Sequence, residues 1–437
     1  MLIQTIDATA IATALPDIAR SFGIDPVTAT LVITSYLIGM AVTVPAGGWL
    51  ADRYGGANTF RFATLVVVLA AIGCVLASNL SLLMVARFIG GAASSLMLPI
   101  GRLMVVRSVP RERLSSAVTT FATIGLIGPI VGPLFGGVLV ELFGWRSIFV
   151  AVLPLGVLII LAVSLIADDD KMQDAAKLDI KGLALCGTGL TCIVAAMEML
   201  GHQAELPWVV GLLLAGFGLL ASLGYHARTA SNPLIRIGLL QRPALRASIL
   251  SDFPMRMTIS ASPMLVSLLM QVGLHESAIV TGMMLLAPAL GNLGVKPAIA
   301  YCLPRIGISG TMAIGAIVGS LAFVSLSLVC DAGWMVALLA ALAVHGLGRA
   351  MVVNGGTILN FAQVSPAEMG AVTSLSALFQ QMALVAGVGV ATVSLRLFGD
   401  GPLDLSTVRM AILVMGMIGL LALIPLRAIP REASSMP

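Results

Sequence analysis

Charged residues are scarce in this sequence. Only 10% of its 437 residues are Asp, Glu, Lys or Arg, and 59% are hydrophobic, whereas a typical soluble domain carries about 25% charged residues. A surface built from this composition would not stay hydrated. The composition therefore excludes a soluble globular protein and indicates that lipid surrounds most of the chain.

Several functional signatures are lacking as well. The chain has no GxxxxGK[ST] sequence for binding the phosphates of ATP, no CxxC pair among its five cysteines, and no catalytic triad or cluster of metal ligands. Its Lys and Arg residues are dispersed over short loops and form no basic domain for nucleic acid. We expect no enzyme activity, no cofactor, no metal and no nucleic-acid partner.

Long apolar segments, in contrast, recur along the whole chain. A helix crosses a bilayer with about 20 mainly apolar residues, and the short alternating segments of a membrane barrel are absent. The sequence predicts an all-α polytopic membrane protein with about fourteen spans, each boundary good to about two to four residues. The first span is short, which suggests that the chain begins after its true start. The expected spans are 1–19, 28–50, 59–78, 80–106, 115–140, 145–166, 179–200, 206–226, 245–272, 276–300, 309–330, 333–359, 367–397 and 406–427.

Lys and Arg are concentrated in alternate loops. Short cytoplasmic loops of membrane proteins carry an excess of both residues. If the N-terminus is cytoplasmic, the inner loops hold most of them, and the outer loops hold little beyond Arg20, Arg146, Arg396 and Arg409. The distribution predicts that both termini face the cytoplasm.

Two short patterns recur in the second half of the chain. Asp52-Arg53-Tyr54-Gly55 follows the second span, and Pro304-Arg305-Ile306-Gly307 follows the tenth. Pro110-Arg111-Glu112 precedes the fifth span, as Pro366-Ala367-Glu368 precedes the thirteenth. Paired halves with a binding site between them are typical of secondary transporters.

These repeats divide the chain into three parts. Residues 1–166 are expected to form an N-terminal half of six helices, and residues 229–437 a C-terminal half of six helices. Residues 167–228 between them are expected to be a linker with two inserted central transmembrane helices. Its polar segments are too short to form a folded domain of their own.

A compact motif ends the second span. The segment Gly48-Trp49-Leu50-Ala51-Asp52-Arg53-Tyr54-Gly55 has a GxLADRxG pattern that resembles the signature of the major facilitator superfamily. The resemblance implies that Gly48, Asp52, Arg53 and Gly55 act as a conformational gate, in which the aspartate interacts with the start of a helix in the opposite half. An ordinary solvated turn is the plain alternative.

The partner expected for Asp52 is the start of the thirteenth span. Ser365 to Glu368 resembles a capped helix start, and a carboxylate gains about 0.3–1 kcal/mol at a helix N-terminus. Family members usually carry basic residues soon after the glycine of the motif. Gly56 and Ala57 stand there in this chain, which predicts a weaker gate.

The fifth span carries a second motif, in which glycines recur every four residues. Gly128, Gly132, Pro133, Gly136 and Gly137 match GxxxGPxxGG, a pattern associated with antiporters in the same superfamily. Glycines spaced by four fall on one helix face and allow two backbones to approach closely. An ordinary helix-packing face is the alternative interpretation.

Two charged residues lie within predicted spans of the N-terminal half. Asp7 begins a segment, Asp7 to Pro16, that is similar to the LDxTIVNxALP motif of the fourteen-helix drug:proton antiporters. Arg87 begins Arg87-Phe88-Ile89-Gly90-Gly91, which resembles the family motif RxxQG with Gly90 in place of glutamine. An ionisable residue inside a membrane is a functional candidate because its burial is costly. The resemblance implies that Asp7 and Arg87 couple transport to protons, and a structural ion pair is the alternative.

Polar residues of the C-terminal half suggest a lining for the central cavity. Asp252 and Arg256 are four residues apart and share one helix face. Gln380 and Gln381 look like a glutamine pair found in the same family, and one of them is expected to face the cavity while the other bonds a neighbouring helix. These four residues form the candidate substrate cavity, although a structural ion pair explains the first two equally well.

Taken together, the motifs resemble those of the fourteen-helix drug:proton antiporter family, a bacterial multidrug exporter subgroup. The resemblance implies export of small organic or amphipathic compounds in exchange for protons across the bacterial inner membrane. Expected partners are a small-molecule substrate, protons and membrane lipid, whereas periplasmic or outer-membrane efflux partners are not specified. A dedicated metabolite transporter, a non-transporting membrane sensor and a defective copy are the alternative functions.

Overall fold

The structure, a computed structural model, describes residues 2–108, 128, 131–166, 179–201, 206–230, 236–329, 335–362, 368–399 and 403–427. The regular elements in these ranges are all helical. In chain order they are α1 (Leu2–Phe22), η1 (Thr28–Thr30), α2 (Leu31–Thr43), η2 (Val44–Ala46), α3 (Gly47–Tyr54), α4 (Gly56–Leu76), α5 (Leu80–Ser108), the helix Val131–Phe143, α7 (Arg146–Ile166), α8 (Ile180–Gly201), α9 (Leu206–Thr229), η4 (Ile237–Gln241), α10 (Pro243–Leu268), η5 (Leu269–Gly273), α11 (Ala278–Leu293), α12 (Val295–Val329), α13 (Met335–Ala362), α14 (Met369–Leu397), α15 (Leu405–Leu420) and α16 (Leu423–Leu426).

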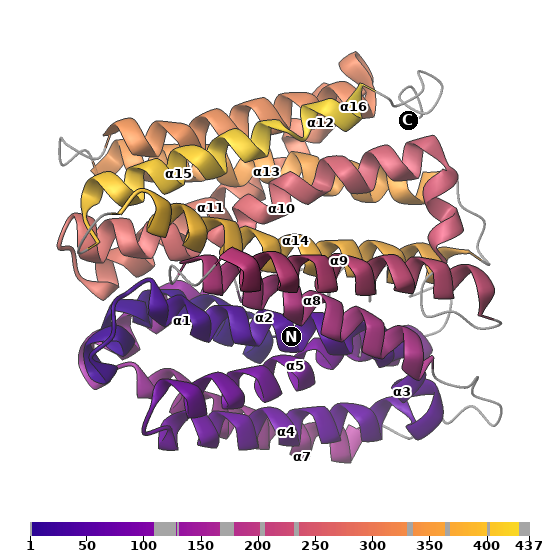
Figure 1. Ribbon diagram of the computed structural model, residues 1–437, viewed down its shortest axis with the longest axis horizontal. Coiled ribbons are helices and arrows are strands. Elements are labelled where there is room, and N and C mark those ends of the chain that lie inside the picture. Colours follow the sequence, from indigo (N-terminus) through magenta and orange to yellow (C-terminus); the bar gives the residue numbers. More distant parts are fainter. Residues whose placement is uncertain are drawn as a thin grey trace.

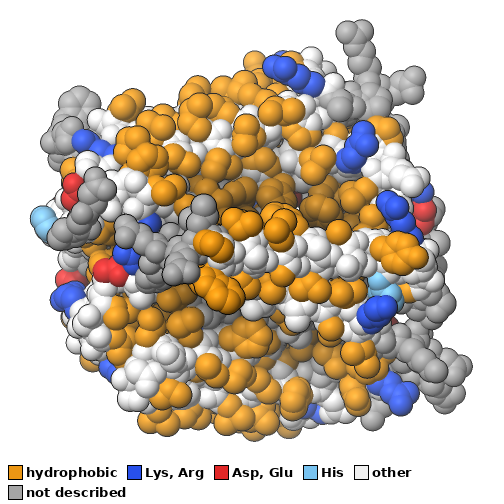
Figure 2. Space-filling model, viewed as in Figure 1, with side chains coloured by type: hydrophobic (Ala, Val, Ile, Leu, Met, Phe, Trp, Pro, Cys, Tyr) orange, Lys and Arg blue, Asp and Glu red, His pale blue; other side chains and the backbone are white. Residues whose placement is uncertain are grey.

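The helices have the length and composition of membrane spans. Nine of those in the described ranges are long and apolar enough to cross a bilayer, and three shorter apolar helices accompany them. Hydrophobic side chains cover most of the face in Figure 2, and charged side chains gather mainly toward its two ends. The described parts of the expected spans are helical apart from short breaks at their ends, the fifth span being described mainly from residue 131 and the tenth running from α11 into α12. The predicted all-α polytopic fold is confirmed.

The first helix begins and ends close to the expected bounds of the first span. α1 is 21 residues long, and at about 1.5 Å per residue it matches a hydrocarbon core of about 30 Å. It continues past Ala19 to Phe22, and Arg20 forms an ion pair with Asp17 one turn earlier. The end of α1 at Phe22 lies within about two to four residues of the expected end of the first span at 19.

The bundle is arranged as two groups of helices with α8 and α9 across their seam (Figure 1). Helices α1 to α7 form the lower group in this view, and α10 to α16 form the upper group. We name the end at which α1 finishes the Phe22 end, and the opposite end, at which α3 finishes, the Tyr54 end. α8 packs against α2 of one group and α14 of the other.

Glycines set the close approach of α2 and α5 in the N-terminal group. A methyl group added to Gly39 would overlap the carbonyl oxygen of Phe88, and one added to Gly91 would overlap that of Tyr36. Only a residue without Cβ allows this backbone contact. The two glycines therefore fix how α2 and α5 cross.

The same arrangement is found in the C-terminal group. A methyl group on Gly291 of α11 would overlap the carbonyl oxygen of Ala343, and one on Gly346 of α13 would overlap that of Pro288. In both groups each contacted residue lies three positions before the partner glycine. The packing repeats in detail, as the sequence echo predicts.

The repeated loops at the Tyr54 end also share a backbone conformation. Gly55 has φ 89° and Gly307 has φ 69°, in the region that residues with a side chain avoid. Four residues later, Thr59 donates its hydroxyl to the carbonyl of Gly55 and Thr311 does so to that of Gly307, each over 2.7 Å. The second echo, at residues 110–112 and 366–368, falls almost entirely outside the described residues.

The two groups are joined by hydrogen bonds at the Phe22 end. Gln271 of η5 donates to the carbonyl of Thr13 over 2.9 Å, and the hydroxyls of Thr30 and Thr392 are 3.2 Å apart. Arg396 of α14 reaches Asp25 in the loop after α1. These contacts close the Phe22 end of the seam.

Candidate functional site

Arg87 lies inside the N-terminal group, on α5. Only 3% of the residue is exposed, and its guanidinium carbon lies 4.1 Å from the centroid of the Tyr36 ring and 5.6 Å from that of Phe149. Its Nε donates to the carbonyl of Val32 over 3.4 Å. A cation between two ring faces gains about 2 kcal/mol or more when water is excluded, so the packing keeps the charge in an apolar place.

The fixed ring of Tyr36 supports this arrangement. Ser94 donates a hydrogen bond to the Tyr36 hydroxyl over 2.8 Å. Next to Arg87 lies a cavity of about 10 Å³, which is room for about one water molecule. A Cβ on Gly90 would be 3.3 Å from the Cβ of Ala70, so the glutamine of the family motif has no space here unless α4 moves.

Asp7 lies in the first half of α1. The position of its side chain is outside the described part of the structure. The expected pairing of Asp7 with Arg87 therefore stays a prediction.

The glycines of the fifth span lie between the two groups of helices. A Cβ on Gly136 would be 2.6 Å from the Cβ of Ala10 on α1, and one on Gly137 would overlap the carbonyl oxygen of Ala278 on α11. From the other side, a Cβ on Gly282 would be 2.6 Å from the carbonyl oxygen of Pro133. The helix Val131–Phe143 is thus pressed against one helix of each group. Gly128 and Gly132 are helical and buried.

The expected gate occupies α3 and the turn after it. Gly48 is the second residue of α3, Asp52 and Arg53 lie in its last turns, and Gly55 has the positive φ that the turn requires. The hydroxyl of Thr59 donates to the carbonyl of Leu50 over 3.1 Å and thereby holds the turn against α3.

The predicted partner segment of Asp52 lies mostly outside the described residues. Its last member, Glu368, is the N-cap of α14 but makes no side-chain cap bond. Its carboxylate instead binds Arg242 at 2.6 Å and 3.2 Å. The contact of Asp52 with the start of the thirteenth span therefore stays a prediction.

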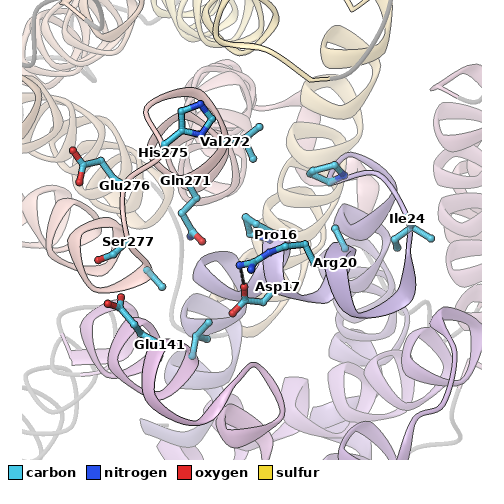
Figure 3. A pocket seen from close by; sticks show the side chains of 14 residues that line it. Pro16, Asp17, Arg20, Ile24, Glu141, Gln271, Val272, His275, Glu276 and Ser277 are labelled. Atoms are coloured by element: carbon cyan, nitrogen blue, oxygen red, sulfur yellow. Dashed lines mark hydrogen bonds and ion pairs between the residues drawn. The ribbon is translucent and has the colours of Figure 1, made fainter.

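A cavity lies at the Phe22 end, between the two groups of helices (Figure 3). Its volume is about 590 Å³, within the range of about 300–1,000 Å³ that suits a small ligand. Pro16, Asp17 and Arg20 of α1 face it from one side, and Gln271 and Glu276 from the other.

Acidic side chains outnumber basic ones around this cavity. Its lining includes three carboxylates, of Asp17, Glu141 and Glu276, against one guanidinium, of Arg20, and one imidazole, of His275. Asp17 and Arg20 form an ion pair, so two carboxylates remain without that compensation. The cavity therefore favours positively charged groups.

Glu141 makes a contact that the sequence did not predict. Its Oε2 accepts a hydrogen bond from the backbone N–H of Ile279 over 3.0 Å, in the first turn of α11. Carboxylates are stabilised at helix N-termini by the helix dipole. A carboxylate from one half thus binds the start of a helix in the other half. This is the kind of interaction that was predicted for Asp52, but it lies at the opposite end of the bundle.

Three of the four predicted cavity residues come together within the C-terminal group. Arg256 and Asp252 form an ion pair along α10, and Gln380 of α14 lines the same small space of about 10 Å³. This conformation offers no room there for an organic compound. Gln381 is not part of this lining, and its buried Oε1 accepts no hydrogen bond from the described residues.

The polar part of this lining also includes Asn360 of α13 and Ser376 of α14. Sequence reasoning missed both residues. Asn360 follows an apolar run and carries no pattern of its own, so only the packing of α13 against α10 brings it to Asp252.

The sequence matches the Major Facilitator Superfamily over residues 1–230. The chain belongs to this family of membrane transporters. It is 30% identical over 403 residues to the "Putative multidrug resistance protein MdtD" of Salmonella typhi, an alignment that covers 91% of this chain and 85% of that protein. The protein of the same name from Salmonella typhimurium matches equally well, at 30% over the same length.

Solved structures of transporters share the fold. The POT family transporter PepTSo aligns with a TM-score of 0.72, 14% identity, and coverage of 99% of this chain and 97% of that one. The human organic anion transporter MFSD10 aligns with a TM-score of 0.62 and 15% identity, with 97% of both chains covered. At these identities the likeness concerns the fold of the transporter, not its substrate.

Proposed function

We propose that this transporter exports small organic or amphipathic compounds in exchange for protons. The observation that carries the proposal is the position of the antiporter motif. Gly136 and Gly137 press one helix against α1 and α11 at once, so the motif seals the seam between the halves. A sealed seam keeps protons from leaking while the binding site changes sides.

Two further observations support the proposal. Relatives that are 30% identical carry a name that refers to multidrug resistance. Arg87 is a buried membrane cation held by Tyr36 and Phe149, and such residues mark proton and ion pathways in transporters. We assign Asp7 and Arg87 to proton coupling, and Gly48, Asp52, Arg53 and Gly55 to the gate.

The proposed location is the bacterial inner membrane, with both termini in the cytoplasm. Arg and Lys collect in loops at the Tyr54 end, which would then face the cytoplasm. The hydrogen bonds at the Phe22 end close the seam on the outer side. This conformation would accept its substrate from the cytoplasm, and the acidic cavity beside Glu141 and Glu276 would be a vestibule on the exit side.

The energy of one proton is sufficient for useful export. Moving one charge through about 150 mV releases roughly 3.5 kcal/mol. At about 1.4 kcal/mol for each tenfold ratio, this supports a substrate gradient of roughly a few hundredfold.

The test is substrate-induced proton movement in proteoliposomes. The internal pH is followed while lipophilic cations and neutral drugs are added to vesicles holding the wild type, Asp7→Asn or Asp404→Asn. We expect proton movement with the wild type and with Asp404→Asn, whose carboxylate only caps α15, and none with Asp7→Asn. Saturable flux of a single metabolite, without proton movement for any drug, would instead support a dedicated transporter.

A further inference from the structure

The ion pair on α10 leaves one carboxylate oxygen without a partner. Asp252 Oδ2 accepts a hydrogen bond from Arg256 Nε, whereas Oδ1 is buried and accepts none from the described residues. Buried polar atoms without a partner are rare in folded proteins and point to a missing proton, water or ion. This oxygen therefore needs an explanation.

A second orphaned oxygen belongs to the same small space. The amide nitrogen of Asn360 donates to Ser376 Oγ over 3.4 Å, but its Oδ1 is buried and accepts no hydrogen bond within the described part of the chain. Asn360 is only 9% exposed, and it lines the cavity of about 10 Å³ together with Asp252 and Arg256. Asp252 Oδ1 and Asn360 Oδ1 are thus two hydrogen-bond acceptors in one small space, and no donor from the described residues lies between them.

We propose that Asp252 is a second proton-binding site of this transporter, with Asn360 as the acceptor for its proton. A proton that binds Oδ1 turns the carboxylate into a carboxylic acid, whose O–H can donate to Asn360 Oδ1 directly or through one water molecule. The added proton satisfies both orphaned oxygens. The role of Asp252 in transport rests on the proposed proton exchange, whereas the binding of a proton to Asp252 does not.

A proton fits this site better than a metal cation does. Of the residues that line the space from α10, α13 and α14, the charged ones are Asp252 and Arg256. Asp252 is the one carboxylate in this lining, and its Oδ2 is already occupied by Arg256, so few oxygen ligands are left for a metal cation. A proton needs neither a coordination shell nor a large cavity.

Protonation would also change the charge of the cluster. The pair of Asp252 and Arg256 is neutral when the acid is ionised and carries +1 when it is protonated. The bond from Arg256 then weakens, because the attraction between the guanidinium and an ionised carboxylate is lost. Pro254 lies between the two residues and removes a backbone hydrogen bond there, so α10 can bend as the pair separates.

The pair is not completely sealed from its surroundings. The side chains of Arg256 and Asp252 keep 15% and 13% of their surface accessible. This exposure is too small for free hydration but sufficient for a water molecule at the edge of the site.

The test is infrared difference spectroscopy of the purified full-length protein during a pH titration. The carboxylic acid C=O band of Asp252 is expected in the wild type and in Asp404→Asn, and is expected to be lost in Asp252→Asn. Asn360→Leu keeps the acid but removes its acceptor, so the band should remain and move to higher frequency. An Asp252→Asn spectrum equal to that of the wild type would overturn the proposal, as would a band that sodium suppresses relative to choline at equal ionic strength.

Proteoliposomes then separate this proposal from the exchange mechanism. If each acid carries one proton in the cycle and exchange cannot proceed without the proton on Asp7, Asp252→Asn should halve the number of protons moved per substrate, whereas Asp7→Asn should abolish the movement. Absence of proton movement in the wild type would contradict the exchange and leave the infrared result for Asp252 standing. An unchanged ratio in Asp252→Asn would overturn the coupling role of Asp252 alone.

Discussion

Arg396 and Asp25 form an ion pair that joins the two halves at the Phe22 end. Arg396, in the last turn of α14, donates to Asp25 Oδ2 and to Thr28 Oγ1, each over 2.8 Å. Both residues are partly exposed, so the pair contributes about 0–1 kcal/mol. A few tenths of a kilocalorie are sufficient to shift an equilibrium between two conformations about twofold.

Loss of this pair should favour opening of the Phe22 end. We expect Arg396→Gln to increase the rate of backbone hydrogen exchange in residues 23–30 and 391–399 by about two- to fivefold. The matched control is Asp404→Asn, which removes a carboxylate at the same end that bonds only Ser406 and Thr407 nearby. Equal exchange in the two variants would mean that the pair does not hold the halves together.

The ion pair of Arg396 and Asp25 also predicts how the closure of the Phe22 end depends on pH. Burial by itself would raise the pKa of Asp25, but hydrogen bonds from Thr28 and Arg396 outweigh it and hold this pKa below its ordinary value. A lowered pKa means that the stabilisation is fully present above about pH 4 and is lost as the pH falls through the folded value. Exchange at residues 23–30 should therefore be constant from about pH 5 to 8, after correction for intrinsic rates, and rise only below about pH 4. Asp25→Asn should remove this rise, and a change near pH 6 would implicate another group.

The seam glycines predict a pair of opposite mutational effects. Gly137→Ala would place a methyl group on the carbonyl oxygen of Ala278, whereas a methyl on Gly211 of α9 would meet no atom within 4 Å. Overpacking costs about 1–3 kcal/mol, and an unhindered Gly→Ala change in a helix gains about 0.5–1 kcal/mol. Thermal unfolding in detergent should therefore shift down for Gly137→Ala and slightly up for Gly211→Ala. Equal midpoints would show that the seam can relax around a side chain.

Arg87→Lys tests whether the planar guanidinium matters. A lysine keeps the charge but loses the flat group that stacks on Tyr36 and Phe149. We therefore expect the protein to become about 1–2 kcal/mol less stable. We also expect substrate-induced proton movement to fall at least tenfold.

Arg146→Lys is the control for that variant. Arg146 also lies over a ring, 4.2 Å from the centroid of Trp145, and donates to the carbonyls of Val75 and Ala77, but it is not among the residues assigned to proton coupling. It should lose stability while keeping proton movement. If Arg87→Lys transports normally, Arg87 holds helices together and does not couple protons.

The spans could be predicted from sequence because the bilayer demands a long apolar segment for each crossing, which is a local property. The end of the first span was set slightly early, because Arg20 is a charged residue and its ion pair with Asp17 on the same helix is not visible in the sequence. Gly55 and Gly307 were recognisable because a turn of this kind requires glycine.

The candidate site was predictable only where it is built from neighbours in sequence. The pair of Asp252 and Arg256 follows from their spacing of four residues. Asn360 reaches Asp252, and Glu141 reaches α11, through the packing of helices distant in the chain. Such contacts depend on the angles at which the helices cross, and no local sequence pattern encodes these angles.

The inserted helices make the two faces of the bundle unequal toward the surrounding lipid. On the seam face in Figure 1, Gly187 of α8 packs against Val42 of α2, and Met197 packs against Gly389 of α14. Helices α8 and α9 therefore cover that side of the seam. An amphipathic compound that diffuses within the bilayer would therefore meet α8 and α9 before it reached this side of the seam.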